Sequence, residues 1–262
     1  MHDRLGIAAA QPRCVPYDLT ANALAHATAV RSARSRVVVF PEMSLTGYEL
    51  DAPAVGPADP RLAPLVDACA RTGSVAFAGA PVEGASGRPH IATLMIDGDG
   101  VTVAYRKVWL GDAEAARFAP GAEPVAVEVD GLRLGLAVCK DLNVARHARD
   151  TAALGIDVYV AAALKFDSEA DAMAARAREI AAGHGVWAVV AAFAGPTGGG
   201  YERTTGRSGV WAPGGEQVAQ AGPEPGDMAR ATITRASVMG ATVTDATVID
   251  ATATSAIVTS AR

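Results

Sequence analysis

The sequence has little of several features that mark particular protein classes. It contains three cysteines in 262 residues (Cys14, Cys69 and Cys139), too few and too widely spaced for a disulfide framework or a Cys-x-x-Cys metal site. A net charge of -5 provides no basic surface for nucleic acid. The longest apolar run, residues 186–194, falls well short of the ~20 residues that a membrane-spanning helix needs. The start, MHDRLGIAAAQP, has no basic stretch followed by a long apolar segment, so no signal peptide is expected. We therefore expect a cytoplasmic protein with neither nucleic acid nor membrane as a partner.

The remaining composition is that of a folded chain, with 50% hydrophobic and 19% charged residues. Short β-rich runs alternate with Ala-rich helical stretches. Expected strands cover residues 5–10, 36–40, 74–81, 157–162 and 186–193, and expected helices cover residues 19–34, 60–72, 144–154 and 168–184. Hairpins are predicted at 91–106, 125–138 and 208–220, the first two from Asp-Gly turns and the third from Pro-Gly-Gly. This mixture predicts one α/β domain over residues 1–234, with helices outside a mixed sheet.

The last part of the chain, residues 235–262, has a different pattern. Alanine recurs at every fifth position from 231 to 261, mostly followed by Thr and then by Val or Ile. Such a period is typical of pentapeptide repeats, but six units are too few to bury a core alone. We expect this Ala/Thr-rich extension to dock as strands on the domain or on a partner subunit. The alternative is a loose, partly ordered extension.

Three segments place a reactive side chain just past an expected strand, where the active sites of layered α/β folds gather. They are FPEMSLTGY with Glu42, YRKVWL with Lys107, and GLAVCKDL with Cys139. A carboxylate, an ammonium and a thiol together provide a base, an electrostatic stabiliser and a nucleophile for acyl transfer. Five histidines show no paired ligand spacing, so no metal site is expected.

In their order along the chain, their spacing and their local sequence, these segments resemble the carbon–nitrogen hydrolase family, or nitrilase superfamily, in its amidase-like branch. A fourth segment, EAARFAPG, resembles the part of the family that carries a second glutamate, here Glu114. The resemblance covers about residues 5–233. It implies a four-layer α-β-β-α sandwich of mixed sheets with outer helices, and assembly into a homodimer or higher homo-oligomer.

The resemblance and thiol chemistry together predict a mechanism. A free thiol has a pKa of ~8.5 and must be activated at neutral pH. Glu42 is expected to take the proton of Cys139, whose sulfur then forms a thioester. Lys107 and the backbone N–H of Lys140 would hold the oxyanion, and Glu114, by resemblance, would orient Lys107 and the substrate. This route needs no metal or cofactor.

The expected reaction is hydrolysis of a small linear amide, with release of ammonia or an amine. Tyr48, Leu164 and Phe166 are expected to contact that substrate. Nitrile-cleaving members usually carry Trp directly after the nucleophile, so Lys140 argues against nitrile hydrolysis. Two alternatives use the same three residues, Glu42, Lys107 and Cys139, namely an N-carbamoyl hydrolase and an acyl transferase. A third is a non-catalytic binding protein of the same fold.

Overall fold

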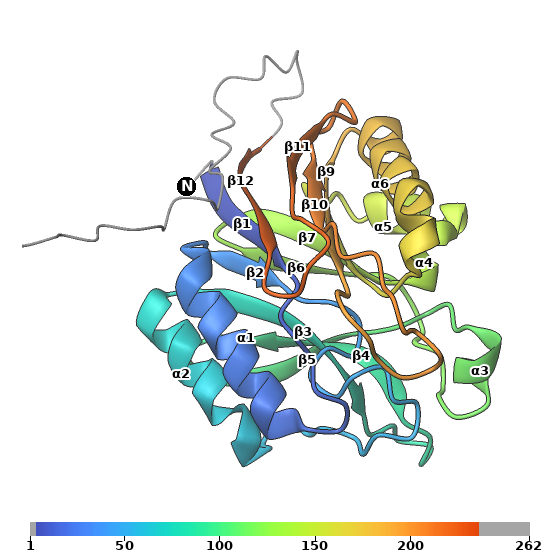
Figure 1. The fold of residues 1–262 in the computed structure, drawn as a ribbon. Coiled ribbons are helices and arrows are strands. Elements are labelled where there is room, and N and C mark those ends of the chain that lie inside the picture. The colour runs from blue at the N-terminus through green and yellow to red at the C-terminus, as the bar shows by residue number, and fades with distance from the viewer. Residues whose placement is uncertain (1–3, 236–262) are drawn as a thin grey trace, which may run out of the picture.

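The computed structural model describes residues 4–235, which form two six-stranded sheets packed face to face between outer helices (Figure 1). The strand order is β12-β1-β2-β3-β4-β5 in the first sheet and β11-β10-β9-β8-β7-β6 in the second. Both sheets contain parallel and antiparallel pairs. The α-β-β-α sandwich of mixed sheets that the resemblance implies is therefore confirmed. No helix within residues 4–235 is long and apolar enough to cross a membrane.

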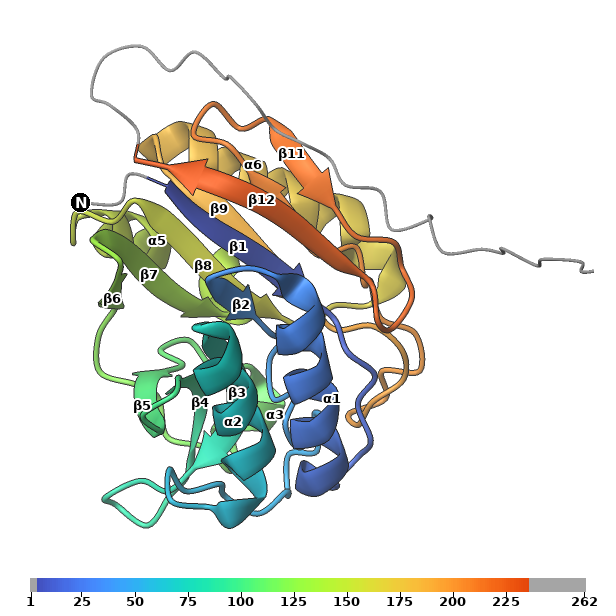
Figure 2. The same ribbon diagram turned by 90° about the vertical axis from the view of Figure 1, so that its left-hand side faces the viewer.

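The elements have the following bounds. The first sheet contains β1 (Arg4–Ala10), β2 (Val37–Val39), β3 (Val75–Val82), β4 (His90–Ile96), β5 (Val101–Arg106) and β12 (Met228–Thr234). The second contains β6 (Val125–Val129), β7 (Leu132–Val138), β8 (Val158–Ala163), β9 (Trp187–Ala192), β10 (Gly209–Trp211) and β11 (Gln217–Gln220). The helices are α1 (Leu19–Ala33), α2 (Ala63–Thr72), α3 (Asp112–Ala115), α4 (Lys140–Asn143), α5 (Ala145–Ala152) and α6 (Ala170–His184). Helices α1 and α2 cover the first sheet, and α5 and α6 cover the second (Figures 1 and 2).

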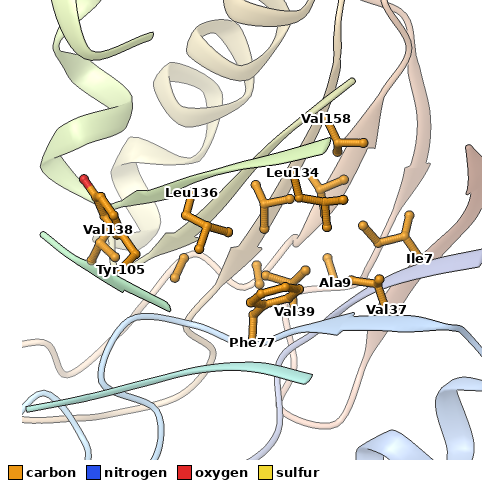
Figure 3. Close-up of a cluster of buried hydrophobic side chains, with 14 of the residues drawn as sticks. Ile7, Ala9, Val37, Val39, Phe77, Tyr105, Leu134, Leu136, Val138 and Val158 are labelled. Carbon is orange, nitrogen blue, oxygen red and sulfur yellow. The ribbon is translucent and has the colours of Figure 1, made fainter. Parts of the chain in front are cut away.

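The inner strands are apolar throughout because both of their faces are buried. In β2, Val37 and Val39 belong to the core between the two sheets, whereas Val38 belongs to the core beneath α1 and α2. Figure 3 shows Val37 and Val39 directed toward Leu134 and Val158 of the second sheet. Successive residues of an inner strand thus point alternately into the two cores, and this alternation fixes the register of the strand.

Local sequence signals account for several boundaries. The side chain of Asp18 accepts a hydrogen bond from Ala21 N and caps α1. Asp130 and Gly131 have φ values of 52° and 84°, as a tight turn between β6 and β7 requires. The hairpin predicted at residues 125–138 is confirmed.

Two parts of the fold differ from the prediction. The helix expected at residues 144–154 is present as α5, but a short helix that was not predicted, α4, precedes it, and Val144, which is extended with φ −99° and ψ 104°, separates the two. Strand β12 was not predicted, and it pairs antiparallel with β1 from Arg4 opposite Thr234 to Ala10 opposite Met228. Ala231–Thr234, the start of the first five-residue unit, therefore belongs to the first sheet. The docking predicted for the rest of the extension falls on residues 236–262, outside the described residues.

Candidate active site

Glu42 lies in the loop that follows β2. The loop turns sharply at Met43, whose φ is 49°, and Leu45 N donates a hydrogen bond to Gly79 O of β3 at 3.0 Å. A Cβ at position 79 would lie 2.2 Å from Met43 N, closer than any side chain allows. Glycine at this one place in β3 therefore lets the loop approach the sheet and brings Glu42 into the interior, where it is 1% exposed.

Lys107 is the first residue after β5. Its backbone is fixed on both sides, because Lys107 N donates to Ile91 O at 2.8 Å and Gly121 N donates to Lys107 O at 2.7 Å. Glu114 lies in the short helix α3, where its Oε2 accepts a hydrogen bond from Gly111 N at 2.6 Å. The chain between β5 and β6 thus provides one positive side chain, Lys107, and one negative side chain, Glu114, near Glu42.

The three side chains form a buried ionic cluster. Lys107 Nζ donates to Glu42 Oε1 at 2.6 Å and to Glu114 Oε1 at 2.7 Å, and the Tyr48 hydroxyl also donates to Glu114 Oε1 at 2.7 Å. The side chains of Lys107 and Glu42 are each 1% exposed. An ammonium has three protons, so one proton of Lys107 remains for a further acceptor. The second oxygen of Glu42, Oε2, is buried and has no hydrogen-bond partner among residues 4–235.

Cys139 follows β7 in a backbone conformation that non-glycine residues rarely adopt. Its φ is 45° and its ψ is −89°, and such strain costs ~1–3 kcal/mol that the surrounding structure must offset. Cys139 N donates to Ala162 O at 2.8 Å, and its Sγ contacts Leu164 O at 3.1 Å. The turn directs the thiol to the end of the neighbouring strand β8.

Asp141 connects the turn at Cys139 to the segment that follows Lys107. Its carboxylate accepts hydrogen bonds from Val138 N at 2.9 Å, from Trp109 N at 2.8 Å and from the Tyr105 hydroxyl at 2.8 Å. The side chain of Asp141 is fully buried. One carboxylate therefore fixes the turn at Cys139 relative to the strand that presents Lys107.

The electrostatics of the cluster separate the two glutamates. Burial raises the pKa of Glu42 to about 7, against the opposing effect of Lys107. Burial would also raise the pKa of Glu114, but the Lys107 ammonium and the hydrogen bonds from Tyr48 and Gly111 bring it below its ordinary value. Glu42 is thus suited to exchange protons near neutral pH, while Glu114 stays a carboxylate.

The thiol of Cys139 is protonated in the resting protein. Burial and then the charge of Glu42 raise its pKa to about 12, although Lys107 and Lys165 lower it. A neutral thiol next to a carboxylate whose pKa is near 7 fits general-base catalysis, in which the proton moves as the sulfur attacks.

The structure places the other expected residues in different ways. Tyr48 lies beside Glu114, and Leu164 contributes its backbone carbonyl rather than its buried side chain to the surroundings of Cys139. Phe166 is 42% exposed and stacks on Tyr201, with ring centroids 4.2 Å apart. The side-chain ammonium of Lys140 donates to Leu110 O at 2.7 Å, turned away from a role in the cluster.

Two residues near the site were missed by the sequence analysis, namely Tyr201 and Lys165. Tyr201 lies in the glycine-rich segment at 195–206, and its ring packs edge-on against Tyr48 at 5.5 Å. Burial, followed by the charges of Cys139 and Glu42, raises the pKa of Tyr201 to about 12. A single tyrosine within a run of glycines was the available signal. No group of three or more His, Cys, Asp or Glu side chains in residues 4–235 is arranged to hold a metal ion.

Comparison with known proteins gives one family. The family model for carbon–nitrogen hydrolases matches residues 6–241. A Pseudomonas protegens protein described as a hydrolase in the pqqF 5' region is 30% identical over 215 residues, which cover 75% of this chain and 71% of that protein. An (R)-stereoselective amidase from Pseudomonas sp. is 30% identical over 52% of this chain and 50% of its own length.

The fold has solved counterparts. One is a variant of the amidase from Nesterenkonia sp. AN1, which carries the acetamide moiety of fluoroacetamide covalently added at its active-site cysteine. It has a TM-score of 0.77 and 23% identity to this chain, and the match covers 88% of this chain and 91% of that one. At this level of identity the similarity shows the fold.

Proposed function

The chain belongs to the carbon–nitrogen hydrolase family, whose enzymes act on C–N bonds, and we propose that it hydrolyses a small linear amide through a thioester on Cys139. The observation that carries this proposal is the buried cluster of Glu42, Lys107 and Glu114 next to a strained cysteine. The amidase adduct at an active-site cysteine described above supports the same chemistry by similarity.

The proposed acylation starts from the neutral thiol. Glu42 accepts the thiol proton while Sγ of Cys139 attacks the amide carbon, and the carbonyl oxygen becomes an oxyanion. The remaining proton of Lys107 binds that oxyanion, together with the N–H of Lys140, which has no acceptor within α4 because it begins that helix. Glu42 then protonates the leaving nitrogen, and the C–N bond breaks to leave a thioester.

In deacylation, water is the nucleophile and the thiol of Cys139 is the leaving group. Water attacks the thioester carbon while Glu42 accepts its proton, and the thiol of Cys139 is re-formed as the carboxylic acid departs. Glu114 stays ionised and holds Lys107 in place through the 2.7 Å contact. Each step uses side chains of this chain and one water molecule.

The test is release of ammonia from small amides such as acetamide and butyramide by the purified protein. We expect stoichiometric ammonia and carboxylic acid. Carbon dioxide release from carbamoyl compounds alone would support the N-carbamoyl hydrolase instead, and hydroxamate formation with hydroxylamine but no hydrolysis would support the acyl transferase. Ammonia from no amide, with no thiol reactivity at Cys139, would support the binding protein. The cytoplasmic location and the homodimer or higher homo-oligomer expected from the sequence stay predictions.

A prediction separates the two glutamates by the rate at which iodoacetamide alkylates Cys139. Glu42→Gln is expected to slow alkylation ~100-fold or more, because the thiol loses its base. Glu114→Gln keeps the shape and leaves Glu42 on Lys107, so its effect should be much smaller. In the wild-type protein the rate should rise with pH and level off above about pH 7, where Glu42 is ionised. Glu42→Gln should lack this plateau.

The alkylated site is identified by peptide mass, since Cys14 and Cys69 are also free thiols. A larger effect from Glu114→Gln than from Glu42→Gln would mean that the two roles are reversed.

A further inference from the structure

The protein has few lysines, and all of them lie near Cys139 or Glu42. The chain has three lysines, Lys107, Lys140 and Lys165, against twenty arginines. Lys107 contacts Glu42, Lys140 directly follows the nucleophile, and Lys165 directly follows Leu164, whose carbonyl contacts the thiol. The cations elsewhere on the protein are arginines, so each lysine calls for an explanation at the active site.

The backbone of Lys165 is held firmly at the end of β8. Thr205 N donates to Lys165 O at 3.1 Å, and the next residue, Phe166, forms a β-bridge with Thr204. These contacts connect the segment after β8 to the glycine-rich segment that carries Tyr201. The position of Lys165 beside the nucleophile is therefore built into the fold.

The side chain of Lys165 is directed inward. It is 12% exposed, and its ammonium acts on the thiol of Cys139, whose pKa it lowers. Its one hydrogen-bond partner among residues 4–235 is Glu169 Oε1, at a long 3.4 Å. Glu169 is also engaged elsewhere, because its Oε2 accepts a hydrogen bond from Phe166 N at 2.9 Å. The ammonium of Lys165 can therefore take a closer acceptor.

Apart from its effect on the pKa of the thiol, Lys165 has no part in the chemical step described above. Lys107 holds both carboxylates and faces the oxyanion, and Lys140 is engaged with Leu110 O. Glu42 and Glu114 would together repel a negatively charged substrate, since Lys107 offsets only one of them. An additional cation next to Cys139 offsets that repulsion for an anionic substrate and adds no electrostatic attraction for a neutral one.

We propose that Lys165 binds a carboxylate carried by the substrate, so that the enzyme prefers small amides that bear a negative charge. This inference rests on the proposed amidase function and names its substrate class. The stacked rings of Phe166 and Tyr201, 4.2 Å apart, lie next to Lys165 and provide an apolar wall for the carbons between amide and carboxylate. Lys165 acts in binding and specificity, and Lys107 in the chemistry.

The experiment compares succinamate with pentanamide, which has similar length and no charge. Wild-type kcat/KM is expected to be at least ~10-fold higher for succinamate, since a charge-assisted hydrogen bond is worth about one to two powers of ten in affinity. Lys165→Met should abolish this preference mainly through the KM for succinamate. Lys165→Arg should restore it, and Lys165→Glu should shift the preference toward 4-aminobutanamide. Arg71→Met, on the exposed side of α2, is the matched control for loss of a positive charge.

The outcomes are distinguishable. Hydrolysis of pentanamide without preference for succinamate would overturn the role of Lys165 and leave the amidase proposal intact. An equal fall in kcat for both substrates in Lys165→Met would show that Lys165 acts on the thiol instead of the substrate. Ammonia from neither amide, while iodoacetamide still alkylates Cys139, would contradict the amidase function and this inference with it.

Discussion

Cys139→Ala is expected to lower amide hydrolysis by ~10⁴-fold or more while the fold stays intact. Loss of the nucleophile removes the covalent route, and only binding and oxyanion stabilisation remain. The substitution removes one sulfur atom and leaves the backbone of the turn, with its bond from Cys139 N to Ala162 O, unchanged. Steady-state ammonia release measures the first effect, and urea denaturation the second.

Cys14→Ala and Cys69→Ala are the matched controls. Both thiols are free; Cys14 Sγ donates to Ser44 O, and Cys69 lies in the core beneath α1 and α2. We expect both variants to keep most of the activity. Comparable hydrolysis by Cys139→Ala would refute the thioester mechanism.

The same position also tests the strained backbone. Cys139→Gly should be more stable than Cys139→Ala by about 1 kcal/mol, because glycine adopts a φ of 45° without a steric penalty. Equal stability of the two variants would mean that the turn stores no strain.

Lys107→Met is expected to abolish activity and to lower the free energy of unfolding by ~3–5 kcal/mol. Removing one partner of a buried ionic cluster leaves uncompensated charge, which costs more than the cluster itself contributes. Here two carboxylates, Glu42 and Glu114, would face each other without the ammonium that contacts both. Urea denaturation at constant pH gives the loss of stability.

The instability of Lys107→Met should depend on pH with a definite sign. Without the ammonium, burial and mutual repulsion raise the pKa of both carboxyls in the folded state above the unfolded value. The folded state then binds more protons than the unfolded state, so the stability of the variant should recover as the pH falls from 8 toward 5.

A triple variant separates charge from packing. Glu42→Gln and Glu114→Gln, added to Lys107→Met, remove all three charges and should restore at least half of the lost stability. Failure to recover either at low pH or in the triple variant would assign the loss to the shape of the methionine side chain.

The sequence predicts the strands and the reactive residues better than the contacts between them. Buried strands such as β2 and hairpin turns such as Asp130–Gly131 are encoded locally, in apolar runs and in residues that accept positive φ. Strand β12 is not, because its Ala- and Thr-rich sequence forms a strand only by pairing with β1, more than 200 positions earlier in the chain. Sequence position alone cannot indicate such a partner.

The candidate site shows the same division. Glu42, Lys107 and Cys139 are found because each follows an expected strand, and Glu114 is found from the resemblance to the family; the structure places Lys107 in contact with both glutamates. The hydrogen bonds that Asp141 accepts and the positions of Lys165 and Tyr201 depend on how separate loops meet. These contacts are set by the packing of the two sheets and have no local signature.

The concentration of lysine at the active site also determines how the protein responds to amine chemistry. Of the three side-chain amines that acetylating reagents, amine-reactive dyes and aldehyde cross-linkers could modify, Lys107 is 1% exposed and held in the ionic cluster, while Lys140 and Lys165 directly follow Cys139 and Leu164. Attachment to a support through lysine would therefore inactivate the enzyme, whereas coupling through the carboxylates of exposed residues would spare it. Conversely, the rate of lysine acylation in the folded protein reports access to the active site itself, and a bound substrate should slow it.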